Sequence, residues 1–290
     1  MSKTLIIMLV IVTCAIVTVW LFGKYWPHHS IKGDLISSTS TPSATSQVIP
    51  TWTPKPGGKN IVITSPKVGE KVGSPLVVKG KARVFENRFV YILRGQNKSE
   101  LYKDSGVTSA LDVDQYGDFE FKIPVPTQVG GEKVTLEVFD YSPKDGVVEN
   151  LVSVPLQINT KETLDVDVYF TNTKKDSDTI CTKVFPIKRS ILKTSEVAYV
   201  SLYQLIQGPN MAELNEGYDT SIPGQTKINS VSVSNGTAYV DFDKGLEYGI
   251  VGSCMITAIK SQIESTLKQF TSVKNIVMSI DGQTGGILQP

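Results

Sequence analysis

The sequence predicts a multidomain protein: an N-terminal transmembrane helix, then an all-β sandwich, then an α+β domain. Three observations lead to this fold class. Residues 4–23 carry no formal charge. Short runs of alternating apolar and polar residues fill positions 60–159, which is typical of paired strands. Positions 160–290 mix such runs with two segments of helical periodicity, which gives the order β-β-α-β-β-α-β.

The segment at 4–23 has the length of a membrane span. A helix rises about 1.5 Å per residue, so this run covers roughly the 30 Å of a bilayer's hydrocarbon core. A cleaved signal has a shorter apolar region and a small-x-small site after it, and no such site follows here. Cys14 lies in mid-span, which argues against lipid attachment. Trp20, Tyr25 and Trp26 fall where the helix leaves the hydrocarbon, as aromatic side chains at a membrane interface do. We therefore expect a retained anchor in a region 1–32.

Composition excludes several classes of function. Lys plus Arg number 29 and Asp plus Glu 28, and no basic stripe is present, so nucleic acid is not an expected partner. The chain has two histidines, His28 and His29, just past the predicted anchor. No later residue can serve as a histidine base or metal ligand, which removes Ser-His-Asp, Cys-His and histidine-bearing zinc sites from the folded part. The adjacent pair itself is interpreted as polar boundary residues rather than a metal site.

Residues 33–59 are predicted to form a linker. Between Ser37 and Gly58, 16 of 22 residues are Ser, Thr, Pro or Gly, a composition that buries too little apolar surface to fold. Such a chain spans about 25 Å as a flexible coil and up to about 70 Å when extended. This reach would hold a folded part away from a bilayer.

The sandwich is predicted over residues 60–159. Phe119, Phe121 and Ile123 alternate with polar residues, so they share one face of a strand. About seven strands in about 100 residues is the size of an immunoglobulin-like fold. This segment has no cysteine or tryptophan, so we expect a core of aliphatic and phenylalanine side chains alone. The runs lie at 60–66, 76–84, 88–95, 100–103, 118–125, 133–142 and 151–158.

The α+β domain is predicted over residues 160–290, and its clearest feature is a hairpin at 228–242. Asn235-Gly236 is a typical type I′ turn, and it would place Val233 opposite Ala238 and Val231 opposite Val240. The remaining elements are strands at 164–172, 179–189 and 274–282 and helices at 194–209 and 252–270. Thr194 or Ser195 can cap the first helix, and Gly208-Pro209 can end it.

Cys181 and Cys254 are the cysteines outside the predicted membrane span. In an oxidising compartment they can form one disulfide between a strand and the start of the second helix. That bond would stabilise the domain by about 4 kcal/mol in the chain-entropy model. The alternative is two buried thiols that act as small apolar side chains. Without a nearby histidine, catalysis by Cys254 is not expected.

Asp241 and Asp243 lie two positions apart in a predicted strand and would share one face. Paired carboxylates can act as acid and base or hold a cation. Val240 and Phe242 occupy the opposite face, so the aspartates are interpreted as the solvated side of an amphipathic strand. Residues 142–146 indicate a turn and residues 176–178 a loop. We predict no catalytic, cofactor or metal site.

These residues resemble two known families. The stretch "SPKVGEKVGSPLVVKGKARVFENRF", with "VFDYSPKDG" and "VSVPLQI", resembles the immunoglobulin-like domain of bacterial sporulation and germination proteins. The stretches "VYFTN", "YQLIQGP", "IPGQTKINSVSVSNGTAYVDF", "STLKQF" and "VMSIDG" resemble the GerM-type (GerMN) domain. The resemblance implies a bacterial protein held outside the cytoplasmic membrane by one helix or a lipid, with no established catalytic activity. It also implies that residues 60–290 lie outside the cytoplasm, which the nearly balanced flanking charges leave open.

The expected function is therefore a non-catalytic binding or scaffolding role in the cell envelope. The expected partners are the lipid bilayer, through residues 4–23, and an envelope protein or a cell-wall glycan. A homo-oligomer is left open. The alternatives are a peptidoglycan-acting enzyme or enzyme subunit that uses carboxylates, and a glycan-binding module.

Overall fold

The first half of the folded chain pairs its alternating strands into two sheets. The computed structural model describes residues 60–112, 114–178 and 180–289. The predicted anchor at 4–23, the linker at 33–59 and the two histidines lie outside these residues. Within the described part, no helix is both long and apolar enough to cross a bilayer. All described residues fall within one unit of the chain.

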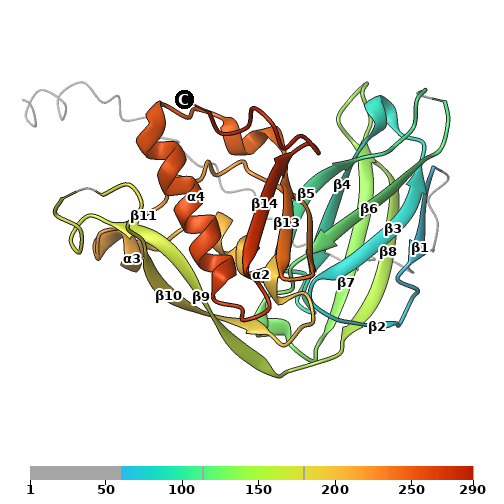
Figure 1. Ribbon diagram of the computed structural model, residues 1–290. Helices are drawn as coiled ribbons and strands as arrows, with labels where there is room; N and C mark the ends of the chain where they lie inside the picture. The colour runs from blue at the N-terminus through green and yellow to red at the C-terminus, as the bar shows by residue number, and fades with distance from the viewer. Residues whose placement is uncertain (1–59, 113, 179, 290) are drawn as a thin grey trace, which may run out of the picture. The chain divides into compact units, whose positions relative to one another are not determined.

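The sandwich has eight strands, one more than the sequence predicts. One sheet has the order β1-β3-β6 and the other the order β2-β8-β7-β4-β5 (Figure 1). The additional strand is the two-residue β2, which pairs in parallel with the end of β8. The strands are β1 (Ile61–Ser65), β2 (Lys71–Val72), β3 (Leu76–Ala82), β4 (Arg88–Arg94), β5 (Glu100–Val107), β6 (Gly117–Ile123), β7 (Lys133–Tyr141) and β8 (Val148–Ile158).

The core of the sandwich follows from the alternation in its strands. Val134, Leu136 and Val138 point inward from β7 and are at most 2% exposed. The ring of Phe89 in β4 packs 4.5 Å from that of Phe119 in the opposite sheet, measured between centroids. The expectation of aliphatic and phenylalanine packing alone is wrong in one respect. Tyr91 also lies in this core, because its ring stacks on Phe121 of β6 and the residue is 5% exposed.

The second domain contains two three-stranded sheets, with the orders β10-β9-β11 and β12-β13-β14. The predicted order β-β-α-β-β-α-β is present, with a short helix and a two-residue strand added after the first helix. The elements are β9 (Thr163–Asn172), β10 (Phe185–Leu192), α2 (Val197–Ile206), α3 (Met211–Asn215), β11 (Tyr218–Asp219), β12 (Ile228–Ser234), β13 (Thr237–Phe242), α4 (Gly252–Lys268) and β14 (Asn275–Ile280).

The hairpin of β12 and β13 has the predicted register. Val233 pairs with Ala238, and Val231 pairs with Val240. The turn residues Asn235 and Gly236 both adopt positive φ, at 49° and 78°, as a type I′ turn requires. After β13 the chain crosses through α4 and returns as β14, parallel to β13.

Two predictions about where elements begin in this domain are wrong. The strand predicted at 179–189 begins only at Phe185, because the preceding residues form a loop held by Asp176, which accepts hydrogen bonds from Ile180 N–H and Lys183 Nζ. Neither Thr194 nor Ser195 caps α2. The N-cap is Glu196, and Thr194 Oγ1 instead accepts a hydrogen bond from Glu196 N–H.

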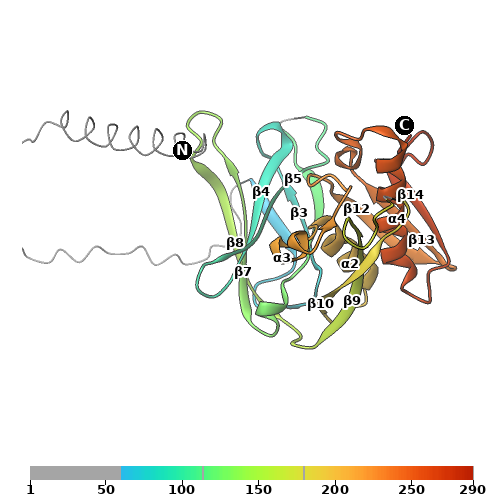
Figure 2. The same ribbon diagram turned by 90° about the vertical axis from the view of Figure 1, so that its left-hand side faces the viewer.

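Helices α2 and α4 fill the space between the two small sheets. Both helices contact β9, and α2 also contacts α4 and β12 (Figure 2). Ile259, Ile263 and Leu267 of α4 are almost fully buried, as their spacing of three to four residues predicts. The stripe of Ala198, Leu202 and Leu205 on α2 enters the same core.

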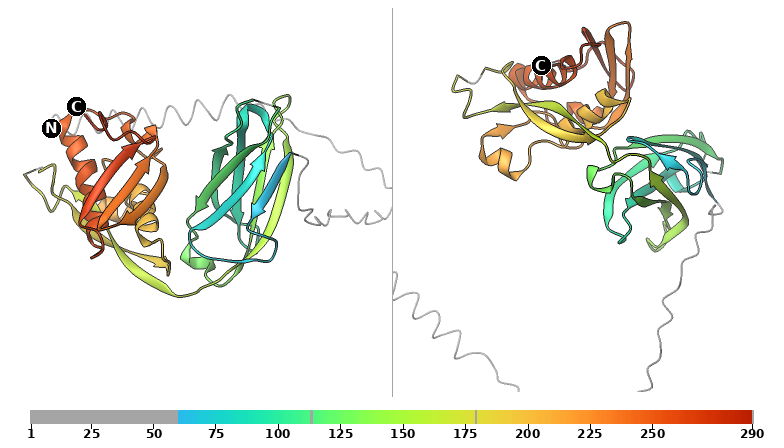
Figure 3. Two further views of the ribbon diagram at one scale, coloured as in Figure 1. Left: turned by 45° about the vertical axis from the view of Figure 1, so that its right-hand side comes forward. Right: turned by 90° about the horizontal axis from the view of Figure 1, so that it is seen from below.

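A buried contact joins the two domains near the point where β8 passes into β9 (Figure 3). Leu192, the last residue of β10, is 1% exposed and belongs to the core of the sandwich rather than to that of its own domain. Gly130 lies against this leucine, and a Cβ there would come within 2.9 Å of Leu192 Cδ2. The base of the second domain is therefore fixed to the sandwich by apolar packing.

Candidate functional site

A cleft of about 960 Å³ lies between the sandwich and the second domain. The sandwich contributes residues of β4, β5 and β6, and the second domain contributes α2, the segment before β12 and the first half of β12. This volume falls within the range of small-molecule and peptide sites, and a boundary between domains is a frequent place for such sites.

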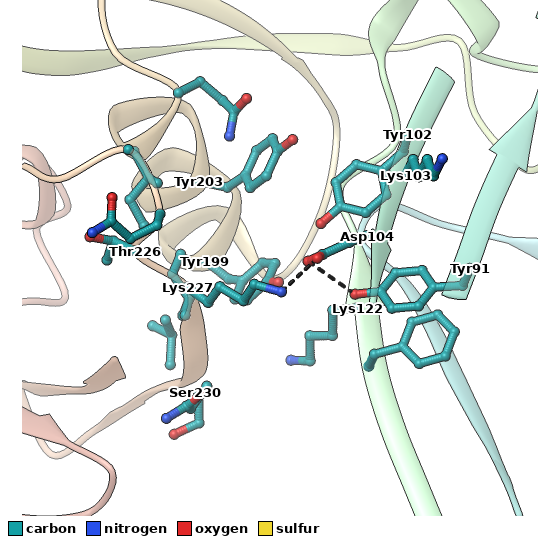
Figure 4. Close-up of a pocket in the computed structure, with 18 of the residues that line it drawn as sticks. Tyr91, Tyr102, Lys103, Asp104, Lys122, Tyr199, Tyr203, Thr226, Lys227 and Ser230 are labelled. Carbon is teal, nitrogen blue, oxygen red and sulfur yellow. Dashed lines mark hydrogen bonds and ion pairs between the residues drawn. The ribbon is translucent and has the colours of Figure 1, made fainter. Parts of the chain in front are cut away.

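Four tyrosines line the cleft from both domains (Figure 4). The ring of Tyr91 stacks on Phe121 at 3.8 Å between centroids and lies 6.1 Å from the ring of Tyr102. Tyr199 and Tyr203 come from α2, where a spacing of four residues places both on one side of the helix. Tyr102 and Tyr203 approach to 6.2 Å across the cleft. The cleft therefore contains a group of aromatic rings from both domains, and each tyrosine adds a hydroxyl group.

These hydroxyls are held in their neutral form. Burial raises the pKa of Tyr91, Tyr102 and Tyr199 well above the usual value of 10, and nearby negative charge from Asp104 acts in the same direction. The same two causes raise the pKa of Tyr203 to about 12. At neutral pH the four groups therefore remain protonated and can donate hydrogen bonds, but none is suited to act as a base.

Charged groups cross the cleft in pairs. Asp104 Oδ1 lies 2.5 Å from Lys227 Nζ, and the other carboxylate oxygen accepts a longer hydrogen bond from the Tyr91 hydroxyl (Figure 4). Lys122 forms an ion pair with Glu196 at the start of α2, and its ammonium group lies 5.0 Å from the centroid of the Tyr199 ring. Each pair joins the sandwich to the second domain, so the charges of the cleft partly neutralise one another.

Sequence reasoning did not find this site. The pattern of α2 drew attention to its core stripe, whereas Tyr199 and Tyr203 lie on another side of the same helix. The sandwich residues come from strands far away in the sequence, and only tertiary folding brings them to the helix. The available signal was the pair Tyr199 and Tyr203, spaced at i and i+4 close to Glu196. These two side chains have no role in the predicted core.

The structure joins Cys181 to Cys254 through a disulfide, with 5.2 Å between the Cα atoms. Cys254 lies in the first turn of α4, as the sequence predicts. Cys181, however, lies in the loop before β10 rather than in a strand. The bond therefore ties the loop between β9 and β10 to the start of α4, away from the residues that line the cleft.

The two aspartates of the predicted carboxylate pair have separate roles. Asp241 ends the outward side of β13 and accepts hydrogen bonds from Ser279 Oγ, Gly282 N–H and Asn229 Nδ2. Burial alone would raise the pKa of Asp241, but these hydrogen bonds outweigh it and hold the pKa below its usual value. A group that stays ionised in this way is poorly suited to be a general acid.

Asp243 does not lie in the strand, because β13 ends at Phe242. It caps the following 3₁₀ turn (Lys244–Glu247) and accepts hydrogen bonds from Gly245 N–H and Lys227 N–H. The prediction that both aspartates form the solvated face of one strand is therefore wrong for Asp243. Its actual contact holds the backbone of Lys227, whose side chain reaches into the cleft.

The other segments considered from sequence are structural in the described residues. Residues 142–146 form a turn in which Gly146 N–H donates to the carbonyl of Ser142. Residues 176–178 belong to the loop that Asp176 organises. Among the described residues, no group of three or more His, Cys, Asp or Glu side chains is arranged to hold a metal ion.

Two family comparisons match the two domains. Residues 60–147 match the family described as the immunoglobulin-like domain of bacterial spore germination. Residues 167–286 match the family described as sporulation and spore germination. The chain carries both domains. The resemblance predicted from the sequence is therefore confirmed, and the cleft lies between two modules of sporulation-associated type.

Solved structures provide weaker matches to about two fifths of this chain. The tandem GerMN domains of the sporulation protein GerM from Bacillus subtilis are 18% identical, with a TM-score of 0.33 over 42% of this chain and 41% of that one. The first GerMN domain of the same protein is 21% identical, with a TM-score of 0.32 over 42% and 85%. A putative lipoprotein from Clostridium perfringens is 20% identical, with a TM-score of 0.28 over 42% and 76%. No curated protein matches the chain.

Proposed function

We propose that this chain is a non-catalytic binding or scaffolding protein of the bacterial cell envelope. In this proposal residues 4–23 anchor it in the cytoplasmic membrane, the linker at 33–59 extends from the bilayer, and the two domains act outside the cytoplasm. The apolar span, the Ser/Thr/Pro-rich linker and the disulfide between Cys181 and Cys254 all support this location, since disulfides persist in oxidising compartments. The sporulation-associated families of both domains support an envelope role.

The cleft is the observation that carries the binding role. Its four tyrosines are neutral hydrogen-bond donors with large apolar rings, and Asp104, Lys122 and Lys227 are in ion pairs. Groups of this kind favour a site that binds a ligand by shape and hydrogen bonding over a site that cleaves one.

The rival function is a peptidoglycan-acting enzyme or enzyme subunit that uses carboxylates. Glycoside hydrolysis needs one carboxyl group that is protonated at working pH and a second that is free to act as base or nucleophile. Asp241 is held ionised by three donors and does not fit the first role, and Asp243 is engaged as the N-cap of the 3₁₀ turn. A glycan-binding module is also compatible with an aromatic cleft.

Cell fractionation and a zymogram test this proposal. We expect the tagged full-length chain to sediment with membranes and residues 60–290 to be cleaved by protease added to spheroplasts. A peptidoglycan zymogram of the full-length chain should show no lysis. Recovery as a soluble cytosolic species, or a mature chain that starts near residue 30, would contradict the anchor. Lysis that disappears in Asp241→Asn would contradict the non-catalytic role.

A further inference from the structure

Three strands that end their sheets meet at the cleft. β5 is last in the five-stranded sheet, β6 is last in the three-stranded sheet of the sandwich, and β12 is last in the sheet β12-β13-β14. Residues of all three strands line the cavity. An edge strand presents backbone N–H and C=O groups that have no partner in the sheet, so it is a template for another strand.

β12 is the least protected of these edges. Its sequence, Ile228–Ser234, contains no charged residue and no proline, and most of its side chains are exposed. β5 and β6, in contrast, bring Glu100, Lys103, Asp104, Glu120 and Lys122 to the cleft. Proteins normally protect an edge with charges or proline, and long uncharged edges pair with other chains. Among the three strands, β12 is therefore the one suited to accept an additional strand.

The hairpin geometry shows which backbone groups face the open edge. Ser234 and Thr237 flank the two-residue turn, so they form a hydrogen-bonded pair, and such pairs alternate along the ladder. Val231 and Val233 occupy the non-hydrogen-bonded positions, and their N–H and C=O groups point away from β13. Within the described residues, neither N–H has a backbone partner outside the ladder.

Open space follows the same strand along its length. Val231 borders both the large cleft and a second cavity of about 290 Å³, and Val233 borders the second cavity. The smaller cavity is lined by Val197 and Ala198 of α2 and by Phe270 and Val273 after α4, together with polar residues that include Glu196. A strand laid beside β12 would place alternate side chains into these two cavities.

The side chains of the cleft set the chemistry of the occupant. Acidic and basic groups are balanced, with Glu100, Asp104 and Glu120 against Lys103, Lys122 and Lys227. The large cavity offers tyrosine rings with hydroxyl groups, and the small one combines aliphatic and aromatic side chains with serines and Glu196. This combination favours an uncharged polypeptide with an aromatic side chain at one position and a smaller aliphatic side chain two residues away.

We propose that an extended, uncharged polypeptide segment binds this protein by adding as a fourth strand to the open edge of β12. The inference rests on the proposed binding function and names the class of partner for the same site. Main-chain hydrogen bonds to Val231 and Val233 provide the affinity, and the tyrosine cleft and the small cavity provide the side-chain preference.

The test uses full-length chain in detergent micelles and a defined probe. The probe is a set of acetylated, amidated octapeptides in which Thr alternates with Val, Phe or Tyr. We expect the peptides that place an aromatic residue two positions away from a valine to bind and to slow amide hydrogen exchange in segment 228–234. Because the charges of the cleft are balanced, the affinity should change little between low and high salt.

A matched pair of variants locates the binding edge. Val233→Lys places a charge on the edge strand, whereas Tyr239→Lys places the same charge on the central strand β13, and the two side chains are 42% and 48% exposed. We expect Val233→Lys to weaken binding by about tenfold, the equivalent of one main-chain hydrogen bond, and Tyr239→Lys to leave it unchanged. Circular dichroism and the melting temperature establish that both variants fold.

Four outcomes would overturn the inference: no peptide bound, equal weakening by the two variants, protection of segment 228–234 by an N-acetylglucosamine tetramer instead of peptide, or protection by concentration-dependent dimerisation alone. None of these outcomes affects the proposed envelope location and absence of lysis, which the fractionation and zymogram test. If those fail and peptide binding remains, the inference stands as a property of the fold and the proposed function is wrong.

Discussion

The sandwich and the second domain are stabilised in different ways. The sandwich encloses one continuous core between two sheets, and no disulfide joins its described residues. The second domain divides its apolar residues between two clusters around α2 and α4 and closes a long loop with the bond between Cys181 and Cys254. The sandwich, with a five-stranded sheet over a three-stranded one, depends on packing alone, whereas the second domain combines two three-stranded sheets with a covalent link.

The largest expected effect tests whether the two domains are independent. Leu192 belongs by sequence to the second domain but is buried in the core of the sandwich. Leu192→Ala should lower the free energy of unfolding by about 2–5 kcal/mol and increase amide hydrogen exchange in both domains. Leu202→Ala is the control, because this residue is equally buried but lies in the core of the second domain. Faster exchange in the second domain alone for both variants would contradict a shared core.

The sequence predicted most of each domain because their cores depend on local periodicity. The alternation in 133–142 and the i, i+4 spacing in 252–270 identify β7 and α4 without knowledge of the partner elements. The register of β12 and β13 was also predictable, because the Asn235-Gly236 turn and the apolar pattern require the same pairing. Leu192 shows the limit of this approach: its position in β10 gives no indication that it packs into another domain.

The cleft was not predictable for a related reason. In the sequence, Tyr91 and Tyr102 look like any other strand residues. Tyr199 and Tyr203 look like residues on the side of a helix that lacks the apolar stripe. Their common site arises from the placement of α2 opposite β4 and β5, which no local pattern encodes. Asp243 shows a different error. The strand pattern of β13 was extended by one residue, which placed the N-cap of the following 3₁₀ turn in the strand.

The second prediction concerns the covalent link. Replacing both Cys181 and Cys254 with Ser should destabilise the second domain by about 2–4 kcal/mol, because the unfolded chain regains the entropy of an open loop. The sandwich should keep its exchange protection, apart from the surroundings of Leu192. Thermal unfolding with and without reductant checks this: the wild type should lose stability on reduction, and the double variant should be insensitive. An unchanged melting temperature after reduction would show that the bond contributes no stability.

The third prediction concerns the hairpin that forms one wall of the cleft. Gly236 has a φ of +78°, which an alanine adopts only with strain, so Gly236→Ala should cost about 1 kcal/mol or more. Gly285 has an ordinary φ and open space around it, and Gly285→Ala should be neutral or slightly stabilising. Denaturant unfolding of both variants measures the difference. If Gly236→Ala were as stable as Gly285→Ala, the type I′ turn would not be needed for the hairpin.

The smallest expected effect is a change in stability at acidic pH, and it arises from Asp241, a carboxylate of the second domain. Hydrogen bonds from Ser279, Gly282 and Asn229 lower the pKa of Asp241 from its usual 3.8. The ionised carboxylate therefore stabilises the folded state fully above pH 3.8, and this contribution is lost as the pH falls through the lowered pKa.

Asp241→Asn removes this contribution while keeping the size of the side chain. Because Asp241 is partly exposed, the loss at neutral pH should be no more than about 1 kcal/mol. The difference in stability between wild type and variant should shrink as the pH falls below the usual pKa of aspartate, and urea unfolding at a series of pH values measures it. A difference that persists at the lowest pH would mean that Asn lacks a contact unrelated to charge. In that case the acid sensitivity of the second domain would have to come from another carboxylate, and Glu213, which forms a partly buried ion pair with Arg189 and whose pKa is also lowered, would be the next to test.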